Sequence, residues 1–348
     1  MLEEYQALQK QGTWSLVPLP PTKTSIGCKW IFKLKRNSDG SIARYKARLV
    51  AKGYLQEEGI DYHDTFSPVA KQPTIRVLLS LALHHHWPIK QLDISNAFLH
   101  GTLEEEVYLS QPPGFINSEA PTHVCKLHKA LYGLKQAPRA WFSTFSSYLT
   151  SVGFKSSHCD NSLFIRHSPT SITIVLIYVD DILVTGSDSS FIFSLITHMH
   201  SAFSMKELGN INYFLGISVQ QTDEGYFLSQ QKYALDILGK AGMLDCKPYS
   251  SPISVKPSVL NSDLLAFSNP SLYRSLVGAL QYLTITRPDL SLAVNYTCQH
   301  MQSPTNGHFA ALKRILRYLK GTISHGLTFS SGPLHLQAYS DSDWAGDS

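Results

Sequence analysis

The chain has 348 residues, of which 43% are hydrophobic and 16% charged, and its formal net charge is +4. This length is enough for two or three domains with a sizeable core. Five cysteines at scattered spacings argue against a disulfide framework and a zinc ribbon. The sequence shows no apolar signal segment, and no apolar run approaches the about 18 residues of a membrane span. We therefore expect reduced thiols, an intracellular protein and no membrane partner.

The first predicted element is a β-hairpin over residues 29–51. Apolar and basic residues alternate along its two strands, and Asp39-Gly40 between them is typical of a tight turn. Residues 29–52 hold eight Lys or Arg against one acid, a local charge of +7 that exceeds the surplus of the whole chain. The hairpin therefore has one apolar and one basic face. The basic face favours a phosphate-rich partner, with a solvated surface as the plainer alternative.

Two later segments place aspartates at the ends of short strands. One strand, over residues 88–94, ends at Asp93. In the other, an apolar run from Ile172 leads into Asp180 and Asp181 and a second apolar run follows, which predicts a hairpin with both carboxylates at its tip. Paired carboxylates beside a core are unfavourable unless a cation neutralises them, and Mg²⁺ prefers such oxygens. The pattern predicts a two-metal phosphoryl-transfer site; a solvated turn and a helix N-cap are the alternatives.

The remaining elements are mostly helical. We expect one helix over residues 75–86, with Val77, Leu78, Leu81 and Ala82 on one apolar face. The segment from Leu131 to Trp141 should begin as a Gly-containing turn and continue into a second helix through Leu149. Residues 246–272, with four Pro and seven Ser, are typical of a linker. Three more helices are predicted over residues 273–283, 290–301 and 308–320, and the last should end before Gly321.

Several segments, taken together and in order, resemble the reverse transcriptase of copia-type retrotransposons. The most specific are Tyr178-Val179-Asp180-Asp181, residues 91–101 (QLDISNAFLHG) and residues 130–141 (ALYGLKQAPRAW). Further matching segments lie at residues 27–30, 44–53, 65–70, 213–217 and 314–321. The Tyr-x-Asp-Asp string alone is short, but all of these segments together are a specific signal that spans nearly the whole chain.

The resemblance implies an α+β fold of the right-hand polymerase type. Its palm would be an antiparallel sheet backed by helices, joined to fingers and to a helical thumb-like region. The expected division is fingers and palm over 1–245, a linker over 246–272, a thumb-like or connection-like region over 273–330, and a truncated RNase H start over 336–348.

The resemblance also assigns roles to residues of the polymerase site. Asp93 and Asp180 would bridge two Mg²⁺ ions, with Mn²⁺ as an alternative metal, and Asp181 would support them as the third catalytic and metal-binding carboxylate. Phe98 resembles the steric gate that crowds a ribose 2′-hydroxyl. The residues expected around the incoming nucleotide are Lys46, Arg48, Lys52, Asn96, Ala97, Phe98, Gly133 and Lys135.

Other expected contacts lie outside that site. The primer grip would be formed by Phe214, Leu215 and Gly216. Contacts to the nucleic-acid backbone are expected from Lys313, Arg317 and Lys320. Lys206 is a candidate general acid for the leaving pyrophosphate, with a surface lysine as the plainer alternative. Asp341 matches the first carboxylate of an RNase H site whose other acids lie beyond this chain, so no RNase H activity is expected.

The implied function is RNA-directed DNA synthesis by a piece of a Pol polyprotein. Its partners would be an RNA or DNA template, a DNA or RNA primer and deoxynucleoside triphosphates, in cytoplasmic virus-like particles with a nuclear phase. The integrase and the complete RNase H domain are absent from the chain. Two alternatives stay open at this point: a silent nucleic-acid-binding remnant of a decayed element, and another two-metal enzyme on a palm-like sheet, such as a nucleotide cyclase.

Overall fold

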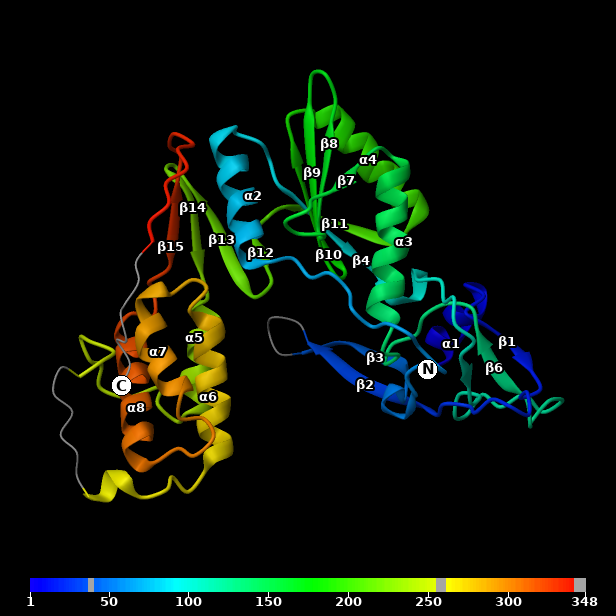
Figure 1. Cartoon of the computed structure of the whole chain (residues 1–348), viewed down its shortest axis with the longest axis horizontal. Helices are drawn as coiled ribbons and strands as arrows, with labels where there is room; N and C mark the ends of the chain where they lie inside the picture. Colours follow the sequence, from blue (N-terminus) through cyan, green and yellow to red (C-terminus); the bar gives the residue numbers. More distant parts are fainter. Residues whose placement is uncertain (37–40, 255–260, 341–348) are drawn as a thin grey trace. The chain divides into compact units, whose positions relative to one another are not determined.

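The computed structural model describes residues 1–36, 41–254 and 261–340, and the chain forms two compact units (Figure 1). The first unit comprises residues 1–75 and 87–210, and the second comprises residues 76–86 and the chain from Ile211 onward. Both units combine antiparallel sheets with helices, so the predicted mixture of α and β structure is confirmed. The predicted domain boundaries and the right-hand layout stay predictions.

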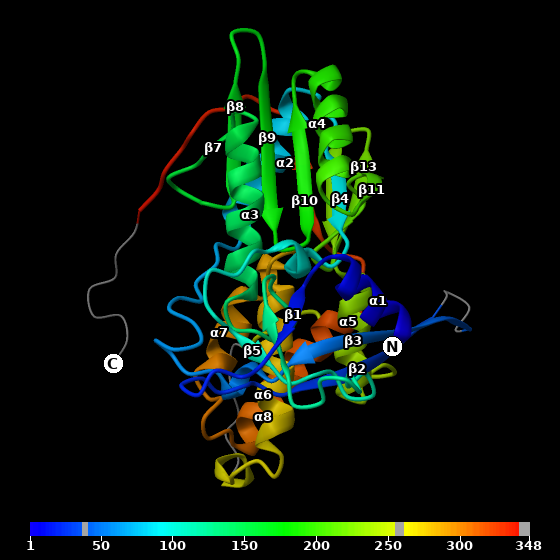
Figure 2. The same ribbon diagram turned by 90° about the vertical axis from the view of Figure 1, so that its right-hand side faces the viewer.

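The centre of the first unit is a six-stranded antiparallel sheet. Its strand order is β11 (Met205–Asn210), β4 (Lys90–Ile94), β10 (Asp181–Gly186), β9 (Ile172–Tyr178), β8 (Leu163–His167) and β7 (Lys155–Ser156). Helices α3 (Ala137–Ser151) and α4 (Ser189–Ala202) cover one face of this sheet (Figures 1 and 2). Alternate strand residues such as Leu92 and Ile182 belong there to one buried cluster with Trp141 of α3. The residues between them, Asp93 included, therefore point to the other face.

Smaller elements complete the first unit. They are helix α1 (Leu2–Lys10) and a three-stranded sheet of β1 (Trp14–Val17), β6 (Val124–Leu127) and β5 (Tyr108–Leu109). Strands β2 (Cys28–Arg36) and β3 (Ile42–Ala51) pair antiparallel, which confirms the strands of the first predicted hairpin; its turn at 37–40 lies outside the described residues. Two single-turn helices, η1 (Gly53–Leu55) and η2 (Ala97–His100), follow β3 and β4.

The two faces of the β2–β3 hairpin differ as the alternation predicts. Lys33 lies opposite Lys46, and Arg48 lies opposite Ile31. On the other face, Phe32 is 67% and Tyr45 is 79% exposed, so the apolar face is largely open along its outer part.

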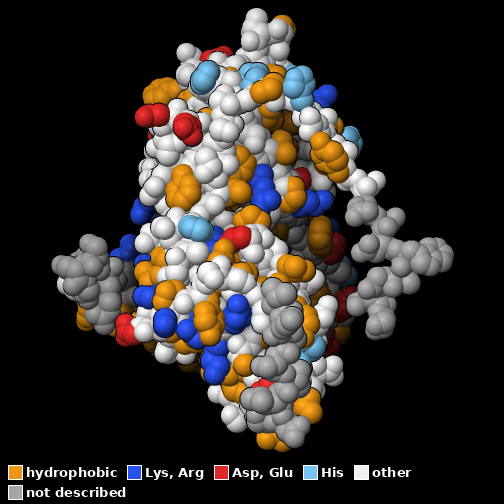
Figure 3. All heavy atoms as spheres, turned by 90° about the vertical axis from the view of Figure 1, so that its left-hand side faces the viewer, with side chains coloured by type: hydrophobic (Ala, Val, Ile, Leu, Met, Phe, Trp, Pro, Cys, Tyr) orange, Lys and Arg blue, Asp and Glu red, His pale blue; other side chains and the backbone are white. Residues whose placement is uncertain are grey.

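The second unit pairs a four-stranded antiparallel sheet with a group of helices. The strands are β12 (Tyr213–Phe214), β13 (Ile217–Thr222), β14 (Gly225–Ser229) and β15 (Leu327–Ser330). The helices are most of α2 (Gln72–His84), α5 (Gln231–Lys240), η3 (Asn261–Leu264), α6 (Pro270–Leu283), η4 (Pro288–Leu290), α7 (Ser291–Cys298) and α8 (Asn306–Gly321). Their core includes Tyr273, Leu276 and Leu316. Lys and Arg side chains lie among apolar ones over the helical part of the face in Figure 3.

The predicted helices form, with shifted ends. Helix α2 begins at Gln72, and Val77, expected on its apolar face, is 55% exposed while Leu79 is buried. Helix α8 includes Gly321 as its last residue, one position later than predicted. The predicted linker is described only in part, since residues 255–260 lie outside the described residues. Of the predicted RNase H start, residues 336–340 are described, and residues 341–348, Asp341 included, are not. Among the described helices, none is long and apolar enough to cross a membrane.

Candidate active site

The predicted aspartates lie together on neighbouring strands. Tyr178 pairs with Asp181 across the β9–β10 hairpin, so Val179 and Asp180 form its two-residue turn. In the adjacent ladder Asp181 lies directly opposite Asp93. The carbonyl of Asp180 accepts a hydrogen bond from the backbone N–H of Ile94 at 2.9 Å. Directly opposed residues share one face of a sheet, so the register itself brings Asp93 and Asp181 side by side.

The hairpin turn is held in an unusual backbone conformation. Val179 has φ of 58°, a left-handed conformation that is unfavourable for a β-branched residue. The indole N–H of Trp141, on α3, donates a hydrogen bond to the carbonyl of Val179 at 2.6 Å. Because Trp141 is 1% exposed, this bond ties the turn to the core.

Burial and mutual repulsion act on the two carboxylates of the hairpin. Burial, followed by the charges of Asp180 and Asp93, raises the pKa of Asp181 to about 6, although a hydrogen bond from Gln91 lowers it. Burial also raises the pKa of Asp180, with Asp93 adding to the effect and Arg48 and Lys46 opposing it. A group of acids that repel one another beside a core favours a cation.

A cavity of about 400 Å³ brings the acids together with basic side chains. Arg44, Lys46 and Arg48 line it from alternate positions of β3, as one strand face requires. Lys206, the candidate general acid, also lines it and lies opposite Asp93 on β11. The complete lining is Met1, Glu3, Glu4, Arg44, Tyr45, Lys46, Ala47, Arg48, Asp93, Ile94, Ser95, Asn96, Asp180 and Lys206.

Two predicted basic residues lie outside this lining. Lys52 follows the end of β3, where the alternation stops, and its stem lies against Gly27. Lys135 donates hydrogen bonds from its ammonium to the carbonyl of Gln56 at 3.2 Å and to the hydroxyl of Tyr62 at 3.1 Å. The local contacts of Lys135 therefore give it a structural role besides any nucleotide contact.

Ala97, Phe98 and Gly133 also lie outside the lining. Ala97 is 3% exposed, and Phe98 packs against the cores on both sides of η2. Gly133 has φ of 90°, and a Cβ there would come within 2.3 Å of the Ala51 carbonyl. Glycine is therefore required where this turn meets the end of β3.

Two acids that the sequence did not suggest enter the cavity. Glu3 and Glu4 lie in the first turn of α1 and line the cavity beside the basic residues of β3. Burial raises the pKa of Glu4, and the charges of Lys46 and Arg48 oppose the effect. No local pattern identifies this contact, because the partners are about forty residues apart and belong to different elements.

The remaining predicted site residues belong to the second unit. Phe214 ends β12, and Leu215 and Gly216 form the turn into β13 with φ of 49° and 76°. The hydroxyl of Tyr282 donates a hydrogen bond to the Leu215 carbonyl. On α8, Arg317 donates to the Lys247 carbonyl and stacks on Tyr249 at 3.5 Å. Lys313 lies 5.2 Å from the Phe309 ring, and Lys320 lies in the last turn.

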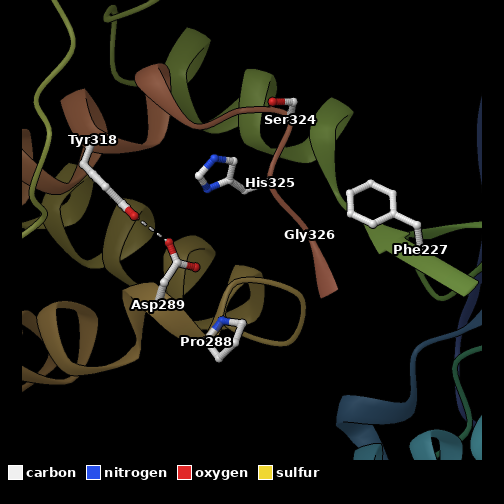
Figure 4. A pocket seen from close by; sticks show the side chains of 7 residues that line it. All are labelled: Phe227, Pro288, Asp289, Tyr318, Ser324, His325 and Gly326. Carbon is white, nitrogen blue, oxygen red and sulfur yellow. Dashed lines mark hydrogen bonds between the residues drawn. The ribbon is translucent and has the colours of Figure 1, made fainter. Parts of the chain in front are cut away.

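A second cavity of about 460 Å³ lies in the second unit between η4, α8 and β14. Figure 4 shows His325 between Tyr318 and Phe227, with the hydrogen bond from Tyr318 to Asp289. The buried Arg287 also binds both carboxylate oxygens of Asp289. The carboxylate of this cavity is therefore already paired with protein side chains.

The first cavity matches a hard metal in donor type. Asp93 and Asp180 line one hollow, and burial together with the charge of Asp93 raises the pKa of Asp180. Within the described ranges, however, no three His, Cys, Asp or Glu side chains converge as ligands of one ion. The two carboxylates therefore fit Mg²⁺ as a partial ligand set, to which substrate oxygens and water would add.

Known proteins with similar sequences show the family of this chain. A family described as "Reverse transcriptase (RNA-dependent DNA polymerase)" matches residues 11–255. The retrovirus-related Pol polyprotein from transposon RE2 of Arabidopsis thaliana is 52% identical over 349 residues, which cover 100% of this chain and 24% of the relative. The corresponding polyprotein from transposon TNT 1-94 of Nicotiana tabacum is 41% identical, covering 100% of this chain and 27% of the relative.

A shorter relative is covered over most of its length. The putative transposon Ty5-1 protein of Saccharomyces cerevisiae is 31% identical over 253 residues, which cover 72% of this chain and 82% of the relative. The chain thus spans about a quarter of the RE2 and TNT 1-94 polyproteins and most of the Ty5-1 protein.

Proposed function

Because the chain belongs to the reverse transcriptase family of copia-type Pol polyproteins, we propose that it extends a primer 3′ end with deoxynucleotides on an RNA template. One observation carries the proposal: the register that sets Asp181 opposite Asp93, with Asp180 in the adjoining turn and basic residues of β3 around the same cavity. Phosphoryl transfer needs that combination, because acids hold metal ions and cations neutralise the phosphates.

Asp93 and Asp180 would hold the two Mg²⁺ ions, and Asp181 would support them from beside Asp93. When bound, such ions activate the attacking hydroxyl and stabilise the leaving oxygen. The burial of the acids and the repulsion between them support this assignment. Mn²⁺ has the same preference for oxygen ligands and would replace Mg²⁺.

The chain's own cations would bind the triphosphate. Lys46 and Arg48 line the cavity beside the acids, and Arg44 extends the same basic face. Their charge would oppose the repulsion between the phosphates and Asp180. Asn96, with φ of 56° after β4, would offer its backbone beneath the phosphates. Lys206 faces Asp93 across the ladder and would donate the proton to the leaving pyrophosphate.

The other predicted contacts extend the same proposal. Lys52, Lys135, Ala97 and Gly133 would shape the nucleotide pocket, and Phe98 would exclude a 2′-hydroxyl. The turn at Phe214, Leu215 and Gly216 would hold the primer, and Lys313, Arg317 and Lys320 on α8 would follow the duplex backbone. Fingers, palm and a thumb-like region in a right-hand layout, divided at residues 245 and 272, would complete the arrangement. Such binding is electrostatic and depends on shape more than sequence.

Primer extension on an RNA template with a DNA primer, Mg²⁺ and deoxynucleotides tests the proposal. We expect the parent chain to extend the primer and the Asp180→Asn, Asp181→Asn double variant to fail, with duplex binding retained in both. Fluorescence anisotropy of a labelled duplex measures that binding. A folded parent that binds the duplex without extending it would instead be a silent remnant. Cyclic nucleotide formed from a triphosphate without primer would identify a cyclase.

A further inference from the structure

Tyr132 is fixed beside the candidate active site by its backbone. Its carbonyl accepts a hydrogen bond from the N–H of Ala51, the last residue of β3, at 2.7 Å. The next residue, Gly133, approaches the Ala51 carbonyl so closely that no other side chain fits. The turn that carries Tyr132 is therefore clamped to the strand that carries Lys46 and Arg48.

The Tyr132 ring contacts two residues with proposed roles. The guanidinium carbon of Arg48 lies 4.5 Å from the ring centroid, within the range of a cation–π interaction. The ring of Phe98 meets it edge-on at 5.2 Å and 63°. Tyr132 thus links the cation expected at the triphosphate with the aromatic expected at the sugar.

Arg48 depends strongly on this contact. Within the described part of the chain, its Nε is buried without a hydrogen-bond partner. A guanidinium without hydrogen-bond partners on that side is positioned by the face it stacks on. The ring is also close to the acids: burial raises the pKa of Tyr132, Arg48 lowers it, and Asp180 and Asp93 raise it further.

We infer that Tyr132 is a positioning residue: its face holds Arg48 toward the cavity of Asp93 and Asp180, and its T-shaped contact sets the ring of Phe98. One side chain then governs both the affinity for the triphosphate and the discrimination between deoxyribose and ribose. This inference rests on the proposed function. The aromatic ring of Tyr132 performs this role and its hydroxyl does not, because Arg48 and Phe98 both contact the ring.

The test measures kcat and KM for single incorporation of dTMP and UMP on an RNA template with a DNA primer. Tyr132→Phe keeps the ring and should stay within about twofold of the parent KM. Tyr132→Leu and Tyr132→Gln remove the ring and should raise the KM for dTTP by about three- to tenfold, with a smaller change in kcat. Both should also incorporate UMP more readily relative to dTMP. If Tyr132→Leu does not fold, the comparison of Tyr132→Phe with Tyr132→Gln decides.

A double-mutant cycle separates positioning from general loss of packing. Tyr132→Gln added to Arg48→Ala should raise KM less than it does in the parent, because the shared contact is already gone. Additive effects, or an unchanged KM and unchanged sugar selectivity in Tyr132→Gln, would overturn the inference while extension by the parent still upheld the proposed function. A folded parent without extension would overturn both.

Discussion

At the scale of single residues, the site depends on backbone geometry that few contacts maintain. Val179 adopts φ of 58° between Tyr178 and the two aspartates, which a β-branched residue tolerates only when neighbours enforce it. The hydrogen bond from Trp141 to the Val179 carbonyl is one such contact. The position of Asp180 therefore follows from a side chain on α3, about forty residues earlier in the sequence.

Trp141→Phe should relax this turn. The variant removes the hydrogen bond and some core volume, so we expect the free energy of unfolding to fall by about 1–3 kcal/mol and the incorporation rate to fall with it. Trp30→Phe is the control, because Trp30 donates a similar hydrogen bond, at 3.0 Å, to the Pro113 carbonyl and not to the β9–β10 turn. Denaturant unfolding and single-turnover incorporation measure both variants. Equal rate losses in the two would refute a specific role for Trp141.

A buried carboxylate provides a second residue-scale prediction. Asp160 is 5% exposed and accepts hydrogen bonds from the Lys71 N–H at 2.9 Å, the Thr74 hydroxyl at 2.6 Å and the Ser162 N–H at 3.0 Å. Burial alone would raise its pKa, but these bonds and the charge of Lys71 hold the pKa below its usual value. The ionised form therefore stabilises the loop and the first turn of α2.

Asp160→Asn should lower the free energy of unfolding at pH 7 by about 1–3 kcal/mol. Because the folded pKa is depressed, the stabilising contribution is complete above the unfolded value of about 3.9 and is lost as pH falls below it. The parent should thus lose more stability between pH 5 and pH 3 than the variant does. Denaturant unfolding across that range checks the prediction, and parallel curves for the two proteins would contradict it.

At the scale of elements, the N-terminus of helix α8 has a capping box in which one member, His308, is titratable. Thr305 accepts from the His308 N–H at 3.3 Å, and His308 Nδ1 accepts from the Thr305 N–H at 3.1 Å. His308 also stacks on His300 with 3.6 Å between ring centroids. Burial, followed by the charge of His300, lowers the pKa of His308. Only the neutral ring can accept the cap hydrogen bond.

The second unit should therefore lose stability in mild acid. A depressed histidine pKa means that stability is complete above the unfolded value of about 6.5 and falls as pH decreases below it. His308→Gln retains a residue suited to this capping box and removes the titration. We expect the thermal midpoint of the parent to drop between pH 7.5 and pH 5.5 and that of the variant to drop less. An identical pH dependence would show that His308 is not responsible.

Helix α8 also tests the proposed contacts to nucleic acid. Lys313→Gln and Lys320→Gln should each reduce the slope of log K against log salt for a labelled duplex by about 1. Lys126→Gln is the control, because Lys126 is engaged by Glu106 at 2.8 Å in the first unit. Unchanged slopes in both α8 variants would remove this helix from the duplex interface.

Much of this local structure could be predicted because it depends on nearby residues. The Asp180–Asp181 hairpin, the strand of Asp93 and the alternating basic face of β3 follow from period-two patterns and turn residues. Helix ends were less accurate: α2 begins three residues before the predicted start, and Val77 is exposed. Where several apolar residues follow one another, as around Val77, the helical period fits more than one choice of buried face, and the sequence does not determine which residue faces the core.

Contacts between distant elements could not be predicted. The sequence places Lys135 in a basic motif but does not show that Gln56 and Tyr62 engage it. Likewise nothing local indicates that Glu4 of α1 enters the cavity of Asp93 or that Trp141 reaches Val179. These contacts depend on tertiary packing, which brings together residues 38 or more positions apart.

At the scale of the whole molecule, the chain is a reverse transcriptase region that spans only about a quarter of the RE2 polyprotein. Its net charge of +4 is modest, so the proposed attraction to nucleic acid would come from local concentrations of Lys and Arg such as β2 and β3. The proposed activity therefore depends on one small cavity in the first unit more than on the overall charge.

Single-turnover incorporation of one dTMP on an RNA template tests the central claim most directly. The parent should incorporate it, Asp93→Asn should not, and Asp188→Asn should match the parent, because Asp188 only caps α4 and Asn is an equally good cap. Duplex binding, measured in the same buffer, should be equal in all three. Incorporation by Asp93→Asn at the parent rate would contradict the account, as would a folded parent that binds the duplex and incorporates nothing.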